Sequence, residues 1–163
     1  MIIRNEEKRD FRAVEEMTKK AFWNVSVPGC NEHYLAHVLR DHPDFVPELD
    51  FVAEEDGKII GNIMYTKCRL VDGQGNEKDV LTFGPLSIHP DYQRKGYGKK
   101  LQLHSFQRAK ELGFDTIVIF GNPENYVGTG FKNGKHFHVG LGGTYPVALL
   151  VKELDDGVLD GRE

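Results

Sequence analysis

The chain has 163 residues, of which 39% are hydrophobic and 28% charged, and its formal net charge is −4. This size predicts one domain spanning residues 1–163, and the acidic balance argues against nonspecific nucleic-acid binding, which depends on clustered cations. No apolar run approaches the roughly 20 residues that span a bilayer, the N-terminus has no signal-peptide shape, and two cysteines give no basis for a disulfide framework. We therefore expect a cytoplasmic protein without a membrane partner.

The first part of the chain predicts two helices and a hairpin. Apolar residues recur at helical spacing before a break that contains Pro28-Gly29. Asp56-Gly57 is a strong two-residue hairpin signal. The expected elements are a strand at 1–4, helices at 8–23 and 32–40, and paired strands at 51–55 and 58–70.

The second part predicts three strands and two helices. Leu101, Ser105, Ala109 and Leu112 form one stripe of a helix that Gly113 caps. The dense apolar run at 115–120 is typical of a central strand buried on both faces. The expected elements are a strand at 79–88, helices at 98–113 and around Tyr126, strands at 115–120 and 147–154, and a frayed acidic tail at 155–163. Interleaved helices and hairpins predict an α/β protein with a mixed sheet and helices on both faces.

The most informative stretch is a glycine-bearing basic loop between the strand that ends near His89 and the following helix. That order places free backbone N–H groups at a helix N-terminus, where they can hold phosphates. A Walker-type loop would place its first glycine at Gln93, and a dinucleotide fingerprint would place its third at Leu101, so neither fits. What remains is Gln/Arg-x-x-Gly-x-Gly/Ala, here residues 93–98.

This loop resembles the pyrophosphate-binding signature of the GCN5-related N-acetyltransferases (GNAT). Tyr126 and Gly130-Phe131 are similar to the family's later Tyr-x-x-x-Gly-Phe segment, and residues 51–61 are similar to its hairpin. The likeness covers nearly the whole chain and is closest to a bacterial subgroup of predicted small acetyltransferases. The alternative for the loop alone is a glycine-rich strand–helix turn.

The resemblance implies a mostly antiparallel sheet splayed in its middle, with acetyl-CoA as the cofactor. It implies that cofactor contacts come from the strand, the loop and the tyrosine segment. The implied cofactor-binding residues are Leu86, Ser87, Ile88, Gln93, Arg94, Lys95, Gly96, Tyr97, Gly98, Lys99, Asn122 and Asn125. The basic residues around the loop favour an anion there, although a solvated helix start would look the same.

Gly84-Pro85 suggests a bulge or splay in the strand, because proline donates no ladder hydrogen bond and glycine is poor strand material. A splay would leave the amides of Leu86, Ser87 and Ile88 free. In the resembling family, amides at this place bind the pantetheine arm and polarise the thioester carbonyl. The alternative is a simple edge distortion.

Tyr126 is the residue we expect to act as a catalytic acid. A phenol is mostly protonated at pH 7 and can give its proton to the thiolate as the C–S bond breaks. The family uses the matching tyrosine in this way in several members. The alternative is that Tyr126 only packs against the cofactor.

The general base is not evident, because the strand at 79–88 has no carboxylate in its middle, where many family members place a glutamate. Glu54, His89 and His138 are the alternatives considered, acting directly or through water.

The seven histidines suggest a metal site only weakly. His33 and His37 are four apart on an expected helix, and His136 and His138 are two apart on an expected strand, so each pair could share a face. No metal-binding motif supports either pair, and we expect no metal. Trp23, His33 and Tyr145 are instead candidates for the wall of the acceptor pocket.

The sequence therefore predicts an acetyl-CoA-dependent N-acetyltransferase acting on a small-molecule or peptide amine, as a monomer or homodimer. Two alternatives remain. One is a non-catalytic acyl-CoA-binding module that senses or regulates, and the other is an interaction protein that shares only the fold. Loss of activity in Tyr126→Phe with intact cofactor binding would separate the enzyme from the sensor.

Overall fold

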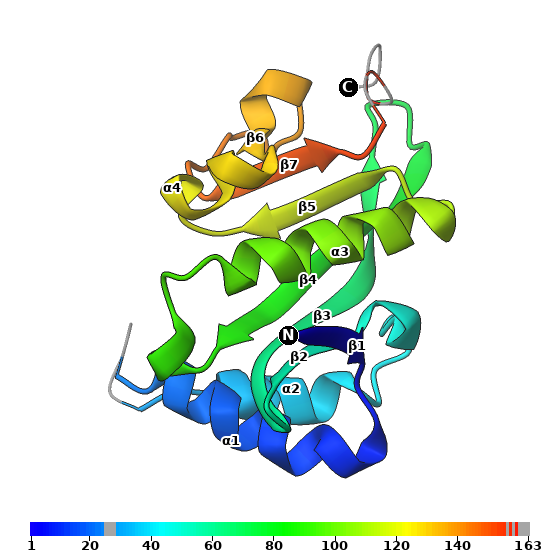
Figure 1. The fold of residues 1–163 in the computed structure, drawn as a ribbon. Helices are drawn as coiled ribbons and strands as arrows, with labels where there is room; N and C mark the ends of the chain where they lie inside the picture. Colours follow the sequence, from blue (N-terminus) through cyan, green and yellow to red (C-terminus); the bar gives the residue numbers. More distant parts are fainter. Residues whose placement is uncertain (25–28, 156, 158, 160–163) are drawn as a thin grey trace. The chain divides into compact units, whose positions relative to one another are not determined.

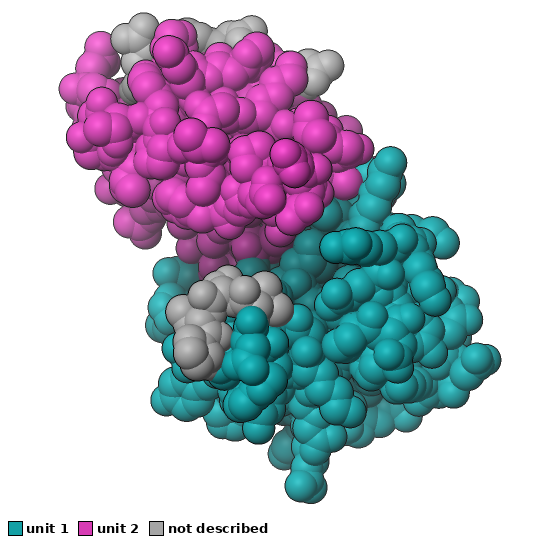
Figure 2. Space-filling model, turned by 90° about the vertical axis from the view of Figure 1, so that its left-hand side faces the viewer, with its two compact units in different colours: residues 1–65, 84–105 teal, residues 66–83, 106–163 magenta. Residues whose placement is uncertain are grey.

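The computed structural model describes residues 1–24, 29–155, 157 and 159. The chain divides into two compact units, shown in Figure 2. Unit 1 comprises residues 1–65 and 84–105, and unit 2 comprises residues 66–83 and 106–163. Pro28 and most of the expected tail lie outside the described residues.

Unit 1 holds the N-terminal elements and the glycine loop (Figure 1). Three of its elements, β3, β4 and α3, continue into unit 2. In chain order the elements that begin or end in unit 1 are β1 (Ile2–Asn5), η1 (Lys8–Asp10), α1 (Phe11–Phe22), α2 (Glu32–Leu39), η2 (Pro47–Leu49), β2 (Phe51–Glu55), β3 (Lys58–Val71), β4 (Glu77–Ile88), η3 (Pro90–Tyr92) and α3 (Tyr97–Glu111).

Unit 2 holds the C-terminal elements together with parts of β3, β4 and α3. The elements confined to it are β5 (Thr116–Phe120), α4 (Pro123–Tyr126), η4 (Val127–Thr129), β6 (Lys132–Asn133), η5 (Gly134–Phe137) and β7 (Leu149–Glu153). The expected helices and hairpin strands agree with these bounds to within a few residues.

The strands follow the order β1-β2-β3-β4-β5-β7-β6. Pairing is antiparallel for β1 with β2, β2 with β3, β5 with β7 and β6 with β7. The β4–α3–β5 connection is a crossover, so β4 and β5 pair in parallel, at Leu81 and Ile117. The predicted mixed, mostly antiparallel sheet is thus confirmed.

Helices cover both faces of the sheet within unit 1. On one face, Val14 of α1 and Ala36 of α2 pack with the strand residues Val52 and Met64. On the other face, α3 packs closely because Gly61 has no side chain: a Cβ there would lie 2.9 Å from Leu101 Cδ1. The Tyr65 hydroxyl also meets Ser105 Oγ of α3 at 2.6 Å.

Unit 2 has a core that includes part of the predicted tail. Val80, Val118 and Val151 form a buried cluster with Leu159, which is 5% exposed. The Leu159 backbone N–H also donates to Glu153 Oε2 (2.9 Å). The expectation of a frayed tail is therefore wrong at Leu159, where one apolar residue of an acidic segment finds a buried position.

Two further expectations in unit 2 were wrong. His136 lies in the 3-10 helix η5 and His138 is left-handed (φ 59°), so the two do not share the face of a strand. The reason is local, because Asn133 accepts a hydrogen bond from the Lys135 amide and starts a turn. Phe120, at the end of the apolar run, is exposed rather than buried on both faces.

Candidate functional site

The glycine loop of unit 1 links η3 to α3. His89 Nδ1 accepts a hydrogen bond from the Asp91 amide (3.1 Å) and thereby caps η3. The turn then passes through Arg94 and Gly96, both with left-handed backbone (φ 62° and 85°), before α3 begins at Tyr97. Glycine adopts that conformation at no steric cost because it has no Cβ, which explains Gly96. A Cβ on Gly96 would meet nothing within 4 Å, so the loop backbone is open to a ligand.

Most residues of the loop expose their side chains, but Gln93 has a partner within the protein. Its Nε2 donates to the Ile88 carbonyl oxygen (2.9 Å), which ties the loop to the end of β4. The Gln93 side chain thus holds the loop in place, a role that sequence reasoning did not assign to it. The exposed members of the loop are Gln93, Arg94, Lys95, Gly96 and Lys99.

The lysines around the loop lie over aromatic rings. Lys95 Nζ is 5.8 Å from the centroid of Tyr92, and Lys100 Nζ is 5.6 Å from that of Tyr97. The two tyrosine rings pack edge to face at 5.9 Å. These contacts place positive charge beside the N-terminus of α3, where it opposes the helix dipole and favours a bound anion.

β4 reaches the loop through the three residues whose amides were expected to be free. A Cβ on Gly61 would lie 3.0 Å from Ile88 Cδ1 and 2.9 Å from Leu101 Cδ1 of α3, so the Ile88 side chain lies on the face of the sheet that α3 covers. The preceding residue of the strand, Ser87, is fully buried. Among the described residues, the Ser87 hydroxyl has no hydrogen-bond partner. The Gly84-Pro85 peptide is cis and lies within the continuous strand.

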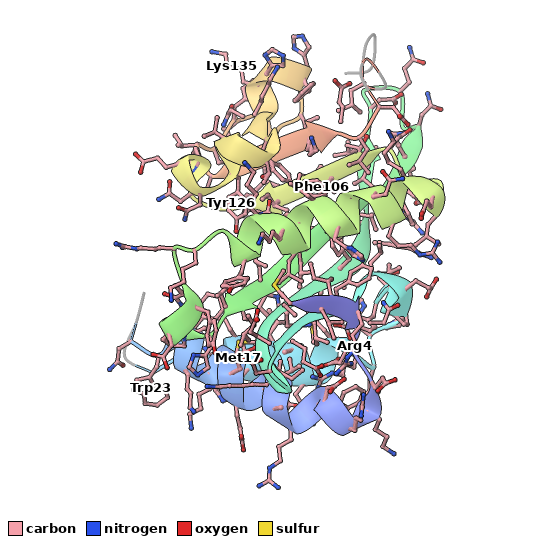
Figure 3. All side chains as sticks on the ribbon, in the orientation of Figure 1. Arg4, Met17, Trp23, Phe106, Tyr126 and Lys135 are labelled. Carbon is pink, nitrogen blue, oxygen red and sulfur yellow. The ribbon has the colours of Figure 1, made fainter. Side chains whose placement is uncertain are left out.

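Tyr126 lies in unit 2 at the end of the short helix α4 (Figure 3). Asn122 caps this helix by accepting a hydrogen bond from the Glu124 amide (3.0 Å). Burial raises the pKa of the Tyr126 phenol, which keeps it protonated at neutral pH. Asn125 lies beside it and is exposed.

The alternatives for the general base have structural partners in unit 1. Glu54 Oε1 accepts from Arg4 Nη2 at 3.0 Å, and both Glu54 and His89 line a cavity of about 480 Å³. Burial, and then nearby Lys58, lower the pKa of His89. Because Nδ1 of His89 accepts the Asp91 amide, the neutral ring carries its proton on Nε2 and has no free lone pair to act as a base. His138, in unit 2, is exposed.

Two of the three residues expected to form an acceptor wall, Trp23 and His33, lie in unit 1, and the third, Tyr145, lies in unit 2. Trp23 borders a cavity with Lys19, while His33 borders another between α1 and α2. Tyr145 is exposed in unit 2. His33 and His37 lie on α2 as expected, but within the described ranges no cluster of three or more His, Cys, Asp or Glu could hold a metal ion.

The fold agrees with comparisons to known proteins. Residues 7–131 match the acetyltransferase (GNAT) family model. The chain belongs to the GNAT acetyltransferase family. This confirms the family and the enzyme class predicted from the sequence.

Two relatives of this GNAT chain have been solved with ligands. The Escherichia coli N-acetyltransferase YhbS is 27% identical over 137 residues, 83% of this chain and 76% of YhbS. Its complex with CoA superposes with a TM-score of 0.82 at 26% identity and covers 99% of this chain and 85% of that one. A Brucella melitensis GNAT acetyltransferase in complex with acetyl-CoA has a TM-score of 0.71 at 30% identity. The match covers 80% of this chain and 82% of the Brucella chain.

A third relative has a named acceptor class. The L-amino acid N-acyltransferase MnaT of Escherichia coli is 25% identical over 151 residues, covering 87% of this chain and 78% of MnaT.

In the part of the chain that the structure describes, no helix is long and apolar enough to cross a membrane.

Proposed function

We propose that this GNAT protein transfers the acetyl group of acetyl-CoA to a primary amine. The observation that carries the proposal is the open glycine loop between η3 and the N-terminus of α3. Family membership and two ligand-bound relatives, with CoA and acetyl-CoA respectively, support the choice of donor.

The residues of the loop fit a pyrophosphate. A Cβ on Gly98 would lie 3.8 Å from Ile88 Cγ1, and one on Gly96 would meet only open space. Anions are stabilised at a helix N-terminus by unpaired N–H groups and by the helix dipole. Arg94, Lys95 and Lys99 add positive side chains, so we assign the phosphates of acetyl-CoA to residues 93–99. Asn122 and Asn125 of unit 2 are proposed as further contacts.

The transfer itself needs a bond to form, a bond to break and two protons to move. The amine nitrogen attacks the thioester carbon, and backbone N–H donation from β4 at residues 86–88 is expected to stabilise the carbonyl oxygen as it becomes an oxyanion. The new C–N bond forms and the C–S bond breaks. Tyr126 donates its proton to the departing thiolate sulfur, and the proton of the attacking amine passes to a base or to water.

The acceptor proposed is a small primary amine, with L-amino acids as the first class to test. The resemblance to MnaT, an L-amino acid N-acyltransferase, supports that class. The alternative acceptors of the same chemistry are peptide N-termini and protein lysines.

A second candidate function is a non-catalytic acyl-CoA-binding module. One observation favours it: Glu54 is paired with Arg4, and His89 uses its acceptor nitrogen to cap η3. Both groups are therefore already engaged within the protein. An enzyme can still pass that proton to water, whereas a sensor needs no base at all.

The test compares wild type with Tyr126→Phe in release of CoA thiol from acetyl-CoA, across L-amino acids and small primary amines. We expect amine-dependent release by the wild type and a fall in kcat of about 100-fold in Tyr126→Phe, with unchanged acetyl-CoA affinity. Tyr34→Phe, which removes an exposed hydroxyl on α2, is the matched control and should keep full activity. Binding without release for any amine would support the sensor instead.

A further inference from the structure

The Tyr126 ring is held on two sides by aromatic neighbours within unit 2. Its centroid lies 5.9 Å from that of Phe83 and 5.8 Å from that of Phe131. Phe131 also packs edge to face on Phe106 of α3 at 6.0 Å, as part of the same cluster. Such contacts restrict rotation of the Tyr126 ring and leave little space into which it could be displaced.

Gly121 closes a third side of the ring. A Cβ built on Gly121 would lie 2.5 Å from Tyr126 Cε2, 3.1 Å from Cδ2 and 3.5 Å from Cζ. The first distance is about 1 Å short of an ordinary carbon–carbon contact. The edge of the ring that meets Gly121 includes Cζ, the carbon that bears the hydroxyl.

The backbone conformation of Gly121 does not explain the glycine. Its φ lies outside the left-handed region, so an alanine could adopt the same backbone without strain. The neighbouring backbone is also fixed. The Gly121 amide donates to the Ala148 carbonyl at 2.9 Å, and the Tyr126 carbonyl accepts from Thr129 Oγ1 at 3.0 Å. An added methyl group must therefore displace the ring.

We infer that Gly121 is a positioning residue, whose missing side chain sets where the Tyr126 hydroxyl lies. The inference rests on the proposed function, in which that hydroxyl protonates the leaving thiolate. Moving a catalytic group by about 1 Å can lower the rate about 100-fold. The atoms nearest to a Cβ on Gly121 all belong to the Tyr126 ring, so we assign its effect to that ring.

The experiment is a double-mutant cycle with Gly121→Ala and Tyr126→Phe, assayed with acetyl-CoA and the fastest amine from the screen above. Gly121→Ala should lower kcat about 10- to 100-fold while KM for acetyl-CoA changes less than about two-fold. In the Tyr126→Phe background the same substitution should have little further effect, because the hydroxyl is already absent. Gly128→Ala, where a Cβ meets nothing within 4 Å, is the matched control and should be neutral.

A second readout needs no acceptor. The ultraviolet titration of phenolate, taken as the difference from Tyr126→Phe, reports the Tyr126 hydroxyl by itself. Burial raises the pKa of Tyr126, so a ring pushed from its place by Gly121→Ala should show a pKa nearer to the ordinary value. If Gly121→Ala fails to fold, adding Tyr126→Leu should restore folding and CoA binding by removing the colliding ring.

Several outcomes would overturn the inference. They are full kcat in Gly121→Ala, losses that add in the double variant, an unchanged phenol pKa, or a folding defect that Tyr126→Leu does not relieve. Failure of the proposed function shows itself differently, because wild type would then release no CoA with any amine, or Tyr126→Phe would keep full activity.

Discussion

Asp50 is a carboxyl group that the fold keeps protonated. Burial, followed by a hydrogen bond with Glu6, raises the pKa of Asp50 to about 9. Asn62 Nδ2 donates to Asp50 Oδ1 at 2.9 Å, while Arg40 pairs with the buried Glu6 at 2.8 Å. Arg40 thus neutralises the carboxylate of Glu6. The carboxyl group of Asp50 stays uncharged by holding a proton, which lowers the free-energy cost of burying it.

This gives a prediction for stability against pH. The folded pKa of Asp50 is raised, so the folded state holds a proton that the unfolded chain releases above about pH 4. The stability from Asp50 is therefore greatest at low pH and is lost as pH rises toward 9, by up to about 1.4 kcal/mol per pH unit. Asp50→Asn keeps both hydrogen bonds without a titrating proton.

Urea unfolding of wild type and Asp50→Asn, between about pH 5 and pH 8, measures the effect. The variant should gain stability relative to wild type as pH rises, and equal slopes for both proteins would contradict the assignment. Glu48→Gln, on an exposed carboxylate of η2, is the matched control and should follow wild type.

At the residue scale, sequence reasoning identified groups by their chemistry but not by their partners. It singled out Gln93 as a ligand contact, yet the side chain donates to the Ile88 carbonyl. It gave Gly121 no role, because a missing side chain matters only through the ring that lies against it. The pairing of Glu6, Arg40 and Asp50 joins positions distant in the chain, and such contacts leave no local pattern.

At the scale of elements, the contact between β3 and α3 depends on Gly61. A Cβ there would lie 2.9 Å from Leu101 Cδ1, 3.0 Å from Ile88 Cδ1 and 3.4 Å from Ala53 Cβ. Since Leu101 is fully buried, the neighbours have little room to move. This close approach holds the start of α3, and with it the glycine loop, beside the end of β4 in unit 1.

Gly61→Val should therefore destabilise the protein by about 2 kcal/mol through overpacking. The measurement is the free energy of unfolding in urea. Gly73→Val, in an exposed turn where a Cβ meets nothing within 4 Å, supplies the comparison and should change stability by less than about 0.5 kcal/mol. Equal losses in the two variants would show that Gly61 is not a close-packing position.

Elements with strong local signals were predicted well. The Asp56-Gly57 turn predicted the β2–β3 hairpin, and the periodic stripe from Leu101 to Leu112 predicted α3. The segment between β6 and β7 was not predicted, because its turns depend on capping by Asn133 and on the close packing of glycines. The last strand was expected at 147–154 and is Leu149–Glu153.

At the scale of the whole molecule, the order of elements was enough to predict the sheet. Interleaved helices and hairpins predicted a mixed sheet, and the structure adds that β4 and β5 form the parallel pair, at Leu81 and Ile117. The glycine loop was predicted for the same reason, since its position between a strand and a helix is a property of the sequence alone. The acceptor wall stays a prediction, because it depends on how distant segments meet.

Binding of acetyl-CoA at the glycine loop is the central claim, and calorimetric titration tests it most directly. Gly96→Glu places a side chain and a negative charge at the N-terminus of α3, where the pyrophosphate is proposed to bind. Gly75→Glu is the matched control, because Gly75 has nearly the same backbone (φ 83° against 85°) and equally open surroundings in a turn of unit 2. We predict saturable binding by wild type and Gly75→Glu and none by Gly96→Glu. No binding to wild type, or unchanged binding to Gly96→Glu, would contradict the account.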